Sequence, residues 1–132
     1  MRHSFSCRVY YEDTDLAGIV YYANYLKFIE RARSEWVREM GVDQVALKSA
    51  GLVFAVRRVE ADYLRPARFD DLLRIETEVL SSSAVRVVLR QEVWCSEILL
   101  FTALVTLVCM AEGAKPARLP AQFRLGLSQT QG

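Results

Sequence analysis

The stretch YYEDTDLAGIVYYANYLKFIERARSEW, residues 10–36, contains the change of hydrophobic pattern that decides the fold. Before and at its start, apolar side chains recur at every second position, which predicts a first β-strand. Over residues 22–40 they recur with helical spacing, which predicts one long amphipathic helix. Three carboxylates, Glu12, Asp13 and Asp15, and then Gly18 lie between the two patterns. The strand is carried by Phe5, Cys7, Val9 and Tyr11, and the helix by Tyr25, Phe28, Ile29, Ala32, Trp36 and Met40.

The rest of the chain is predicted to be mostly β-structure. Gly41 stands where a glycine would end the long helix, and Asp43 and Gly51 bracket a short second one. Alternating patterns over about residues 52–64, 73–79, 85–93 and 98–110 predict four strands, with a turn at residues 81–83. Arg57 falls on the apolar parity of its strand, which indicates either a β-bulge or an inward arginine.

The last predicted strand, residues 98–110, is apolar on both faces. A strand of this kind must be covered on both sides. The single long helix can cover only one face, so we expect a second subunit to cover part of the other. Together the elements predict an α+β domain in two layers, with an antiparallel sheet packed on the long helix.

Length and composition narrow the class of protein. A chain of 132 residues suits one domain, in which we expect residues 121–132 to be a frayed tail. The 17 basic and 16 acidic residues provide no electrostatic footprint for nucleic acid or membranes. We expect no secretory leader, and the longest apolar run is shorter than the ~20 residues of a membrane-spanning helix.

The cysteines and the histidine carry no obvious chemistry. Cys7, Cys95 and Cys109 are far apart in the sequence, and we expect them to be reduced thiols of a cytoplasmic protein. His3 is the only histidine, which argues against a Cys–His nucleophile and against a zinc site.

The acidic residues before the helix permit two interpretations. An aspartate there is most often an N-cap, and an acidic turn is most often solvated. Alternatively, Gly18 lets the loop approach a ligand closely, and the unpaired N–H groups of the helix N-terminus stabilise negative charge on an oxygen. A nearby carboxylate could then attack a carbonyl or deprotonate a water molecule. An activated acyl group such as a thioester would suit this apparatus.

The opening stretch resembles the signature of hotdog-fold acyl-CoA thioesterases of the 4-hydroxybenzoyl-CoA thioesterase type. The bacterial thioesterases associated with the Tol–Pal envelope system are the most similar subgroup. The resemblance continues through FAVRRVEADYLRPARFDDLL (residues 54–73) and ends in KPARLP (residues 115–120). It implies a five-stranded antiparallel sheet wrapped around one helix, protomers joined edge to edge, and a dimer of dimers. One departure is Tyr22, where Tol–Pal-linked members often carry a histidine and the hydroxybenzoyl branch an aromatic residue.

The resemblance also implies site residues. Asp15, the second aspartate of the D-x-D-x-x-G pattern, would be the general base or nucleophile, and the backbone N–H near Tyr22 would polarise the thioester carbonyl. No cofactor or metal is implied, because CoA is part of the substrate. The acyl group would meet Gly18, Ile19, Val20, Asn24 and Tyr25, although Asn24 and Tyr25 also suit helix capping and packing. Basic residues are expected around the CoA phosphates, and the candidates are Arg65, Arg68, Arg86, Arg90, Lys115 and Arg118.

Two alternatives remain from the residues. A hotdog hydratase would pair its aspartate with a histidine on the central helix, and this chain has no histidine after His3. A non-catalytic module that binds acyl-CoA or an acyl carrier, or a partner of an envelope complex, would need no such pair.

Overall fold

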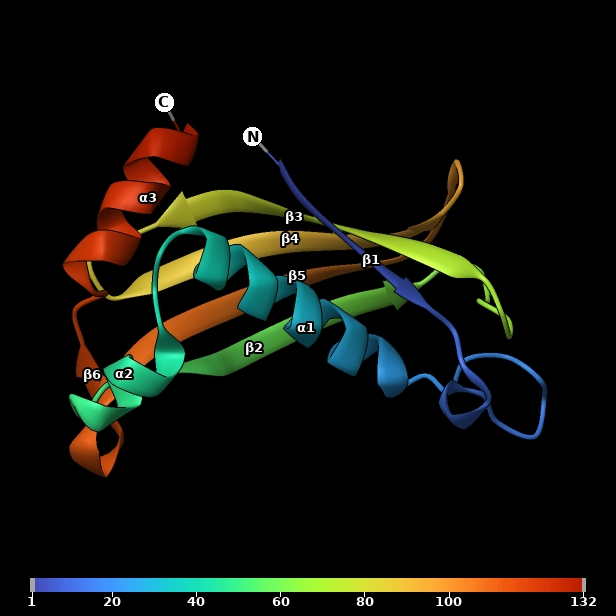
Figure 1. The fold of residues 1–132 in the computed structure, drawn as a ribbon, viewed down its shortest axis with the longest axis horizontal. Helices are drawn as coiled ribbons and strands as arrows, with labels where there is room; N and C mark the ends of the chain where they lie inside the picture. The colour runs from blue at the N-terminus through green and yellow to red at the C-terminus, as the bar shows by residue number, and fades with distance from the viewer. Residues whose placement is uncertain (1, 132) are drawn as a thin grey trace.

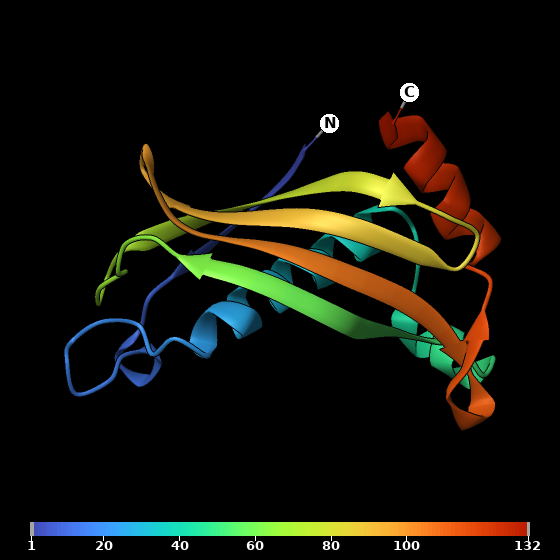
Figure 2. The same ribbon diagram turned by 180° about the vertical axis from the view of Figure 1, so that it is seen from behind.

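In the computed structural model, which describes residues 2–131, an antiparallel sheet lies against the long helix α1. Figure 1 shows α1 crossing one face of the sheet, and Figure 2 shows the opposite face without a helix over it. The strand order is β1-β3-β4-β5-β2, and β6 pairs with β5 outside this path. The elements are β1 (Arg2–Arg8), α1 (Asn24–Glu39), α2 (Gln44–Ser49), β2 (Val53–Tyr63), β3 (Leu72–Ser82), β4 (Arg86–Cys95), β5 (Ile98–Ala111), β6 (Lys115–Ala117) and α3 (Ala121–Gln131).

The helix boundaries follow from the local sequence. Gly41 has a φ angle of 83°, a left-handed conformation that favours glycine, and the chain leaves α1 there. The carboxylate of Asp43 accepts hydrogen bonds from the backbone N–H groups of Val45 and Ala46 at the start of α2. Gly51, with a φ angle of 89°, follows the end of α2. These three predictions are confirmed.

The core lies between α1 and the sheet. The apolar stripe of α1 is buried against the inward-facing side chains of β3, β4 and β5. On β5 one parity is buried, and its members are Phe101, Ala103, Val105, Leu107 and Cys109. The other parity of β5 is only partly covered, and Leu104 there is 37% exposed. The predicted second subunit over this face therefore remains a prediction.

Arg57 marks a β-bulge. The pairing of β2 with β5 shifts register between Val56 and Arg58, and the Arg57 side chain is exposed. An extra residue in one strand lets the alternation resume on the correct face. Of the two interpretations of Arg57, the bulge is therefore the correct one.

The tail is the main correction to the predicted fold. Residues 121–132 were expected to be frayed, but Ala121–Gln131 form helix α3. Phe123 and Leu127 are buried and lie one helical turn apart. The ring centroid of Phe123 lies 5.5 Å from that of Trp36 on α1 and 5.0 Å from that of Phe54 on β2. The tail is therefore docked by its own apolar face.

Smaller corrections concern strands. The short β6 adds a sixth strand to the expected five. The first strand was expected to reach Tyr11, but it ends at Arg8. Tyr11 instead begins a short 3₁₀ turn that spans Tyr11–Asp13. Ser81 and Ser82, expected in a turn, belong to the end of β3. Among residues 2–131, no helix combines the length and apolar character that a bilayer span requires.

Candidate active site

The acidic loop folds as two successive turns. In the first, Oδ2 of Asp13 accepts from the backbone N–H of Tyr10 over 2.8 Å. In the second, Oδ1 of Asp15 accepts from the backbone N–H of Ala17 over 2.9 Å, and the N–H of Gly18 donates to the Asp15 carbonyl over 2.9 Å. Gly18 has a φ angle of 80°, which allows the second turn to close.

The two aspartates therefore have different environments. Asp13 is half-buried and its carboxylate closes the first turn, as expected of a turn residue. Asp15 is exposed, and only Oδ1 of its carboxylate has a hydrogen-bond partner among residues 2–127. The N-cap residue of α1 is Ala23, which provides no side-chain cap. Asp15 is therefore not the N-cap of α1, and Oδ2 is left free.

The entrance of α1 is held in place beside this loop. The backbone N–H of Val20 donates to the Ala67 carbonyl over 2.9 Å, and Ile19 pairs with Arg68 as an isolated antiparallel bridge. The Tyr63 hydroxyl at the end of β2 donates to the Tyr22 carbonyl over 3.0 Å. No hydrogen bond from the Tyr22 N–H to another group is found among residues 2–127.

Asn24 and Tyr25, both candidates for substrate contact, are occupied within the chain. Nδ2 of Asn24 donates to the Asp13 carbonyl over 2.9 Å. Tyr25 is buried, and its hydroxyl accepts from the backbone N–H of Ala67 over 3.1 Å. Its ring stacks on Phe101 with the centroids 4.9 Å apart. Burial raises the pKa of the Tyr25 phenol, although the bond from Ala67 opposes this.

An aromatic chain joins the core to the helix entrance. The ring of Tyr63 lies 5.5 Å from Tyr25 and 6.2 Å from Tyr22, which is 61% exposed. Sequence reasoning assigned Tyr63 only to a strand and missed its hydroxyl as a support of the Tyr22 peptide. The available signal was a tyrosine on the apolar parity at the end of that strand, where a polar tip needs a partner.

A shallow hollow of about 430 Å³ lies next to the first turn. Its floor includes Tyr11 and Phe69, whose rings stack with centroids 4.1 Å apart. Asp15 is not among its lining residues. The hollow therefore borders the candidate site without containing the carboxylate.

The basic candidates divide into three groups by position. Arg65 and Arg68 are exposed on the segment after β2, and Arg68 lies beside the Asp15 turn through its pairing with Ile19. Arg118 and Lys115 are exposed in and after β6, at the opposite end of the molecule from that turn (Figure 1).

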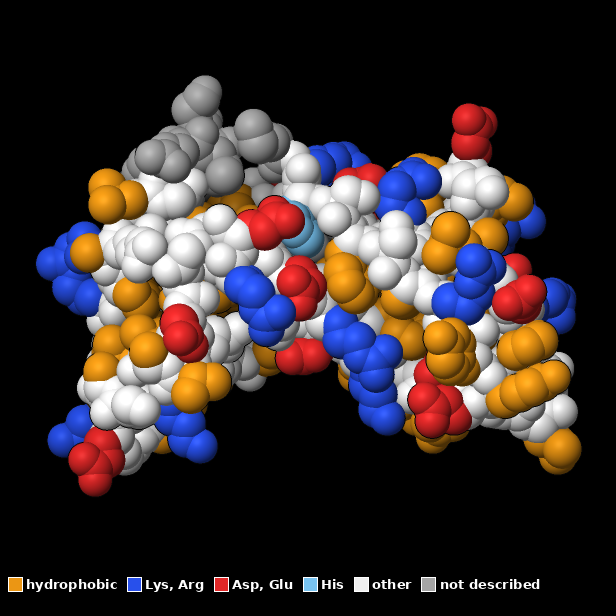
Figure 3. All heavy atoms as spheres, viewed as in Figure 1, with side chains coloured by type: hydrophobic (Ala, Val, Ile, Leu, Met, Phe, Trp, Pro, Cys, Tyr) orange, Lys and Arg blue, Asp and Glu red, His pale blue; other side chains and the backbone are white. Residues whose placement is uncertain are grey.

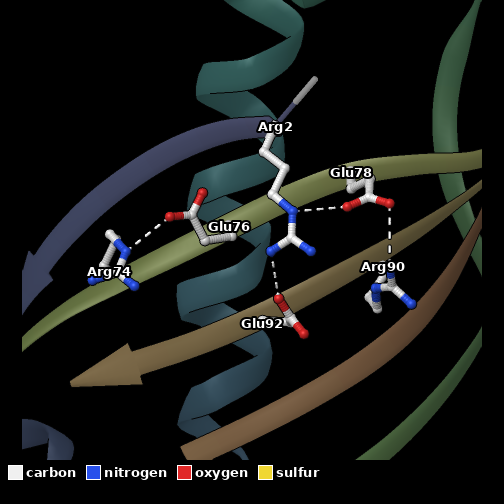
Figure 4. Close-up of polar contacts among 6 residues, drawn as sticks. All are labelled: Arg2, Arg74, Glu76, Glu78, Arg90 and Glu92. Atoms are coloured by element: carbon white, nitrogen blue, oxygen red, sulfur yellow. Dashed lines mark hydrogen bonds and ion pairs between the residues drawn. The ribbon is translucent and has the colours of Figure 1, made fainter. Parts of the chain in front are cut away.

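Arg86 and Arg90 form the third group, on the face of β4 that points away from α1. The neighbouring Gln91 faces α1, so alternation places Arg86 and Arg90 on the other side. Arg90 pairs with Glu78 over 3.2 Å within a network that also joins Arg2 to Glu78 and Glu92 (Figure 4). Of these candidates, Arg68 is the one that a backbone pairing places beside the Asp15 turn.

Metal binding has no support from side-chain clusters. Within the described part of the chain, residues 2–131, no three His, Cys, Asp or Glu side chains gather as a metal site would need. His3 is occupied at the far end of α1, where Nε2 lies 3.2 Å from the Glu39 carboxylate.

An antiparallel sheet wrapped around one long helix is the arrangement that the resemblance to hotdog-fold thioesterases implied. The chain belongs to the thioesterase superfamily, which matches residues 17–102. It is 42% identical over 123 residues to the acyl-CoA thioester hydrolase YbgC of Escherichia coli O6:H1, covering 89% of this chain and 92% of that protein. The acyl-CoA thioesterase YbgC of Haemophilus influenzae is 39% identical over 123 residues, covering 92% of this chain and 90% of that protein.

A solved structure agrees with these relatives. The crystal structure of a probable thioesterase from Bartonella henselae superposes with a TM-score of 0.87 at 40% identity, over 91% of this chain and 100% of that one. The predicted hotdog fold and the predicted family are therefore confirmed. Asp15 lies just before the range that matches the superfamily, and its catalytic role remains a prediction.

Proposed function

We propose that this protein hydrolyses the thioester of an acyl-CoA to a free acid and CoA, with Asp15 as the catalytic carboxylate. The relatives supply the reaction class, since two of them are acyl-CoA thioester hydrolases of nearly the same length. The observation that carries the assignment of residues is the pairing of groups at the entrance of α1. The free Oδ2 of Asp15 and the free N–H of Tyr22 are presented on two segments joined by hydrogen bonds.

These two groups suffice for the reaction. As general base, Asp15 takes a proton from water while the resulting hydroxide adds to the thioester carbonyl carbon. The carbonyl oxygen becomes an oxyanion that accepts a hydrogen bond from the Tyr22 N–H. This hydrogen bond strengthens as negative charge develops on the oxygen. The tetrahedral adduct then expels the CoA thiolate, which accepts the proton that Asp15 took from water.

The same geometry serves Asp15 as nucleophile. Its Oδ2 would add to the carbonyl carbon, the CoA thiolate would leave and take a proton from solvent, and water would hydrolyse the resulting anhydride. In both routes Oδ1 keeps its bond from Ala17, which holds the carboxylate in one orientation.

The test is a panel of short, long and aromatic acyl-CoAs assayed by release of free thiol. Asp15→Asn should lower turnover at least ~100-fold, the scale for losing a general base. The matched control is Asp13→Asn, which keeps the side-chain oxygen that accepts from Tyr10 and should retain turnover. Full activity in the Asp15 variant would refute this mechanism, and no turnover on any thioester would favour a binding module.

We also propose that two copies pair through β2. This strand spans 11 residues and has a neighbour, β5, on one side only. Val53, Val56 and Val59 on it are 37–44% exposed, and the unpaired backbone N–H and C=O groups of a long edge strand favour pairing with another chain. Light scattering measures the assembly, and a monomer would contradict the proposal. Dimer and dimer of dimers are both compatible with the uncovered sheet face.

A cytoplasmic location is part of the same proposal. It is supported by Cys7, Cys95 and Cys109, which are all free thiols as expected in a reducing compartment.

A further inference from the structure

Tyr63 joins the buried aromatic core to the entrance of α1. It is the last residue of β2 and pairs with Phe101 of β5. Its ring makes edge-on contacts with Phe101, whose centroid lies 5.0 Å away, and with Tyr25, whose centroid lies 5.5 Å away. Both of these rings are buried, and they stack on each other. The core therefore holds the Tyr63 ring in place, although Tyr63 itself is 48% exposed.

The Tyr63 hydroxyl donates to a carbonyl that lies just ahead of α1. This is the carbonyl of Tyr22, the residue before the N-cap Ala23. The N-cap carbonyl is the first to accept a bond within a helix, so the Tyr22 carbonyl stands outside the hydrogen-bond ladder of α1. It accepts from the Tyr63 hydroxyl over 3.0 Å instead. This bond fixes the peptide group between Tyr22 and Ala23.

Tyr63 remains a donor at neutral pH. Burial raises the pKa of its phenol above the ordinary value of 10.0, and the neighbouring Tyr22 raises it further. A neutral phenol can donate a hydrogen bond to the Tyr22 carbonyl, whereas a phenolate could not.

The peptide group on the other side of Tyr22 is fixed by different partners. The Tyr21 carbonyl accepts from the backbone N–H of Asn24 over 2.8 Å, and the Tyr21 N–H donates to the Asp13 carbonyl over 2.9 Å. The N–H of Tyr22 belongs to the same peptide group as the Tyr21 carbonyl. A residue has only two soft backbone dihedral angles, and here the peptide groups on both sides of Tyr22 are held. The Tyr22 N–H is therefore fixed in one direction.

The bond from Tyr63 contributes more to geometry than to stability. Figure 3 shows hydrophobic side chains at the surface of the end of the molecule that carries the acidic loop and the start of α1. Tyr22 is 61% exposed there, so water can take the place of the hydroxyl at its carbonyl. A carbonyl that water satisfies costs little free energy, but water does not hold the peptide group in one orientation.

We propose that Tyr63 is a positioning residue of the hydrolysis, whose hydroxyl aims the Tyr22 N–H at the thioester carbonyl. The inference rests on the proposed thioesterase function and adds a residue to it. Tyr63 acts through Tyr22 and does not contact the reacting atoms. An N–H that is free to turn stabilises the developing oxyanion less than a preorganised one does. Loss of the bond therefore lowers kcat and leaves KM unchanged, because the interaction concerned is made in the transition state.

The experiment measures kcat and KM separately for Tyr63→Phe, by release of free thiol from an acyl-CoA that the wild-type protein hydrolyses. This substitution removes the hydroxyl and keeps the ring with its contacts to Tyr25 and Phe101. We expect kcat and kcat/KM to fall together by about five- to twentyfold, which is less than the loss of a whole oxyanion donor. KM should stay within about twofold of the wild-type value.

Two further variants separate position from stability. Ser83→Ala removes a hydroxyl that accepts from the backbone N–H groups of Val85 and Arg86 over 3.3 and 3.2 Å. These residues lie at the opposite end of β5 from the partner of Tyr63, so this variant should keep the wild-type kcat and KM.

Replacement of Tyr63 by 4-aminophenylalanine restores an N–H donor on the same ring. It should recover part of the kcat that Tyr63→Phe loses. Light scattering of each variant checks that its assembly matches that of the wild type, because Tyr63 ends the strand that we propose to pair two copies.

The outcomes separate the two proposals. A wild-type kcat in Tyr63→Phe, or a rise in KM with kcat unchanged, overturns the positioning role alone. A fall in kcat that Ser83→Ala shares, or that the amino group does not reverse even in part, also overturns it. Absence of turnover on every thioester overturns the proposed function and this inference together.

Discussion

Nδ2 of Asn24 donates to the carbonyl oxygen of Asp13 over 2.9 Å, and this bond ties the first residue of α1 to the acidic loop. The backbone N–H of Tyr21 donates to the same carbonyl oxygen, also over 2.9 Å. Asp13 lies two positions before Asp15. The two bonds therefore set the distance between the candidate carboxylate and the N–H groups of the helix entrance.

Asn24→Ala should lower kcat/KM about tenfold, because a small displacement of a catalytic group is costly to the rate. The free energy of unfolding should fall by only about 1 kcal/mol, since Tyr21 still satisfies the Asp13 carbonyl. Steady-state kinetics and urea unfolding measure the two effects. The control is Asp43→Ala, which removes the N-cap of α2 at a similar cost in stability and should leave kcat/KM unchanged. Equal losses of activity in both variants would mean that stability, not position, is responsible.

Arg68→Gln should raise the KM for acyl-CoA by roughly three- to tenfold, the scale of one exposed charge-assisted hydrogen bond. Arg68 is expected to contact a CoA phosphate because its backbone pairs with Ile19, beside the Asp15 turn. The chemical step should be little affected, so kcat should stay near its wild-type value. Arg90→Gln provides the comparison, since Arg90 lies on the far sheet face and pairs with Glu78. An equal rise in KM for both variants would contradict this placement of the CoA phosphates.

Local patterns predicted the fold because each element has a signal within its own residues. The helical stripe from Tyr25 to Trp36 and the left-handed glycine Gly41 define α1 without reference to the rest of the chain. At Arg57 the break in parity indicated either a bulge or an inward arginine, and the register shift shows the bulge. Asp15 could be singled out only by the family pattern, because spacing alone could not separate it from Asp13.

The features that were missed depend on contacts between distant residues. Helix α3 has few apolar side chains, and its docking depends on Trp36 and Phe54, which are far away in sequence. The bond from the Tyr63 hydroxyl to the Tyr22 carbonyl joins the end of β2 to the entrance of α1. No periodicity in the sequence brings such pairs together, since sheet order and packing decide which segments meet.

Phe123→Ala should lower the free energy of unfolding by about 3–5 kcal/mol, the range for removing a large aromatic side chain from a core. Phe123 is completely buried and contacts the rings of Trp36 and Phe54. Leu125→Ala, two positions away in α3, removes a side chain that is 65% exposed and should change stability by less than about 0.5 kcal/mol. Urea unfolding of the two variants measures the difference. A frayed tail would make both substitutions neutral.

Cys7 should make the protein less stable at alkaline pH. Burial raises the pKa of its thiol to about 11 from an ordinary value of 9.0. Two smaller electrostatic effects act on the same thiol: Arg31 lowers its pKa and Asp13 raises it. Between these two pKa values the unfolded chain has lost the thiol proton while the folded chain keeps it. The folded state then binds more protons, so the free energy of unfolding falls as pH rises through this window.

Urea unfolding of the wild type at pH 8 and pH 10 should therefore show a loss that Cys7→Ser lacks. The difference should be at most about 1 kcal/mol, because solvent reaches part of the Cys7 side chain and screens the effect. Ser6→Ala is the control, since Ser6 is an exposed neighbour with no thiol and leaves the titration of Cys7 in place. Other groups also titrate in this range, so only the difference between variants is informative. An identical pH dependence in wild type and Cys7→Ser would show that the Cys7 thiol titrates alike in the folded and unfolded chains.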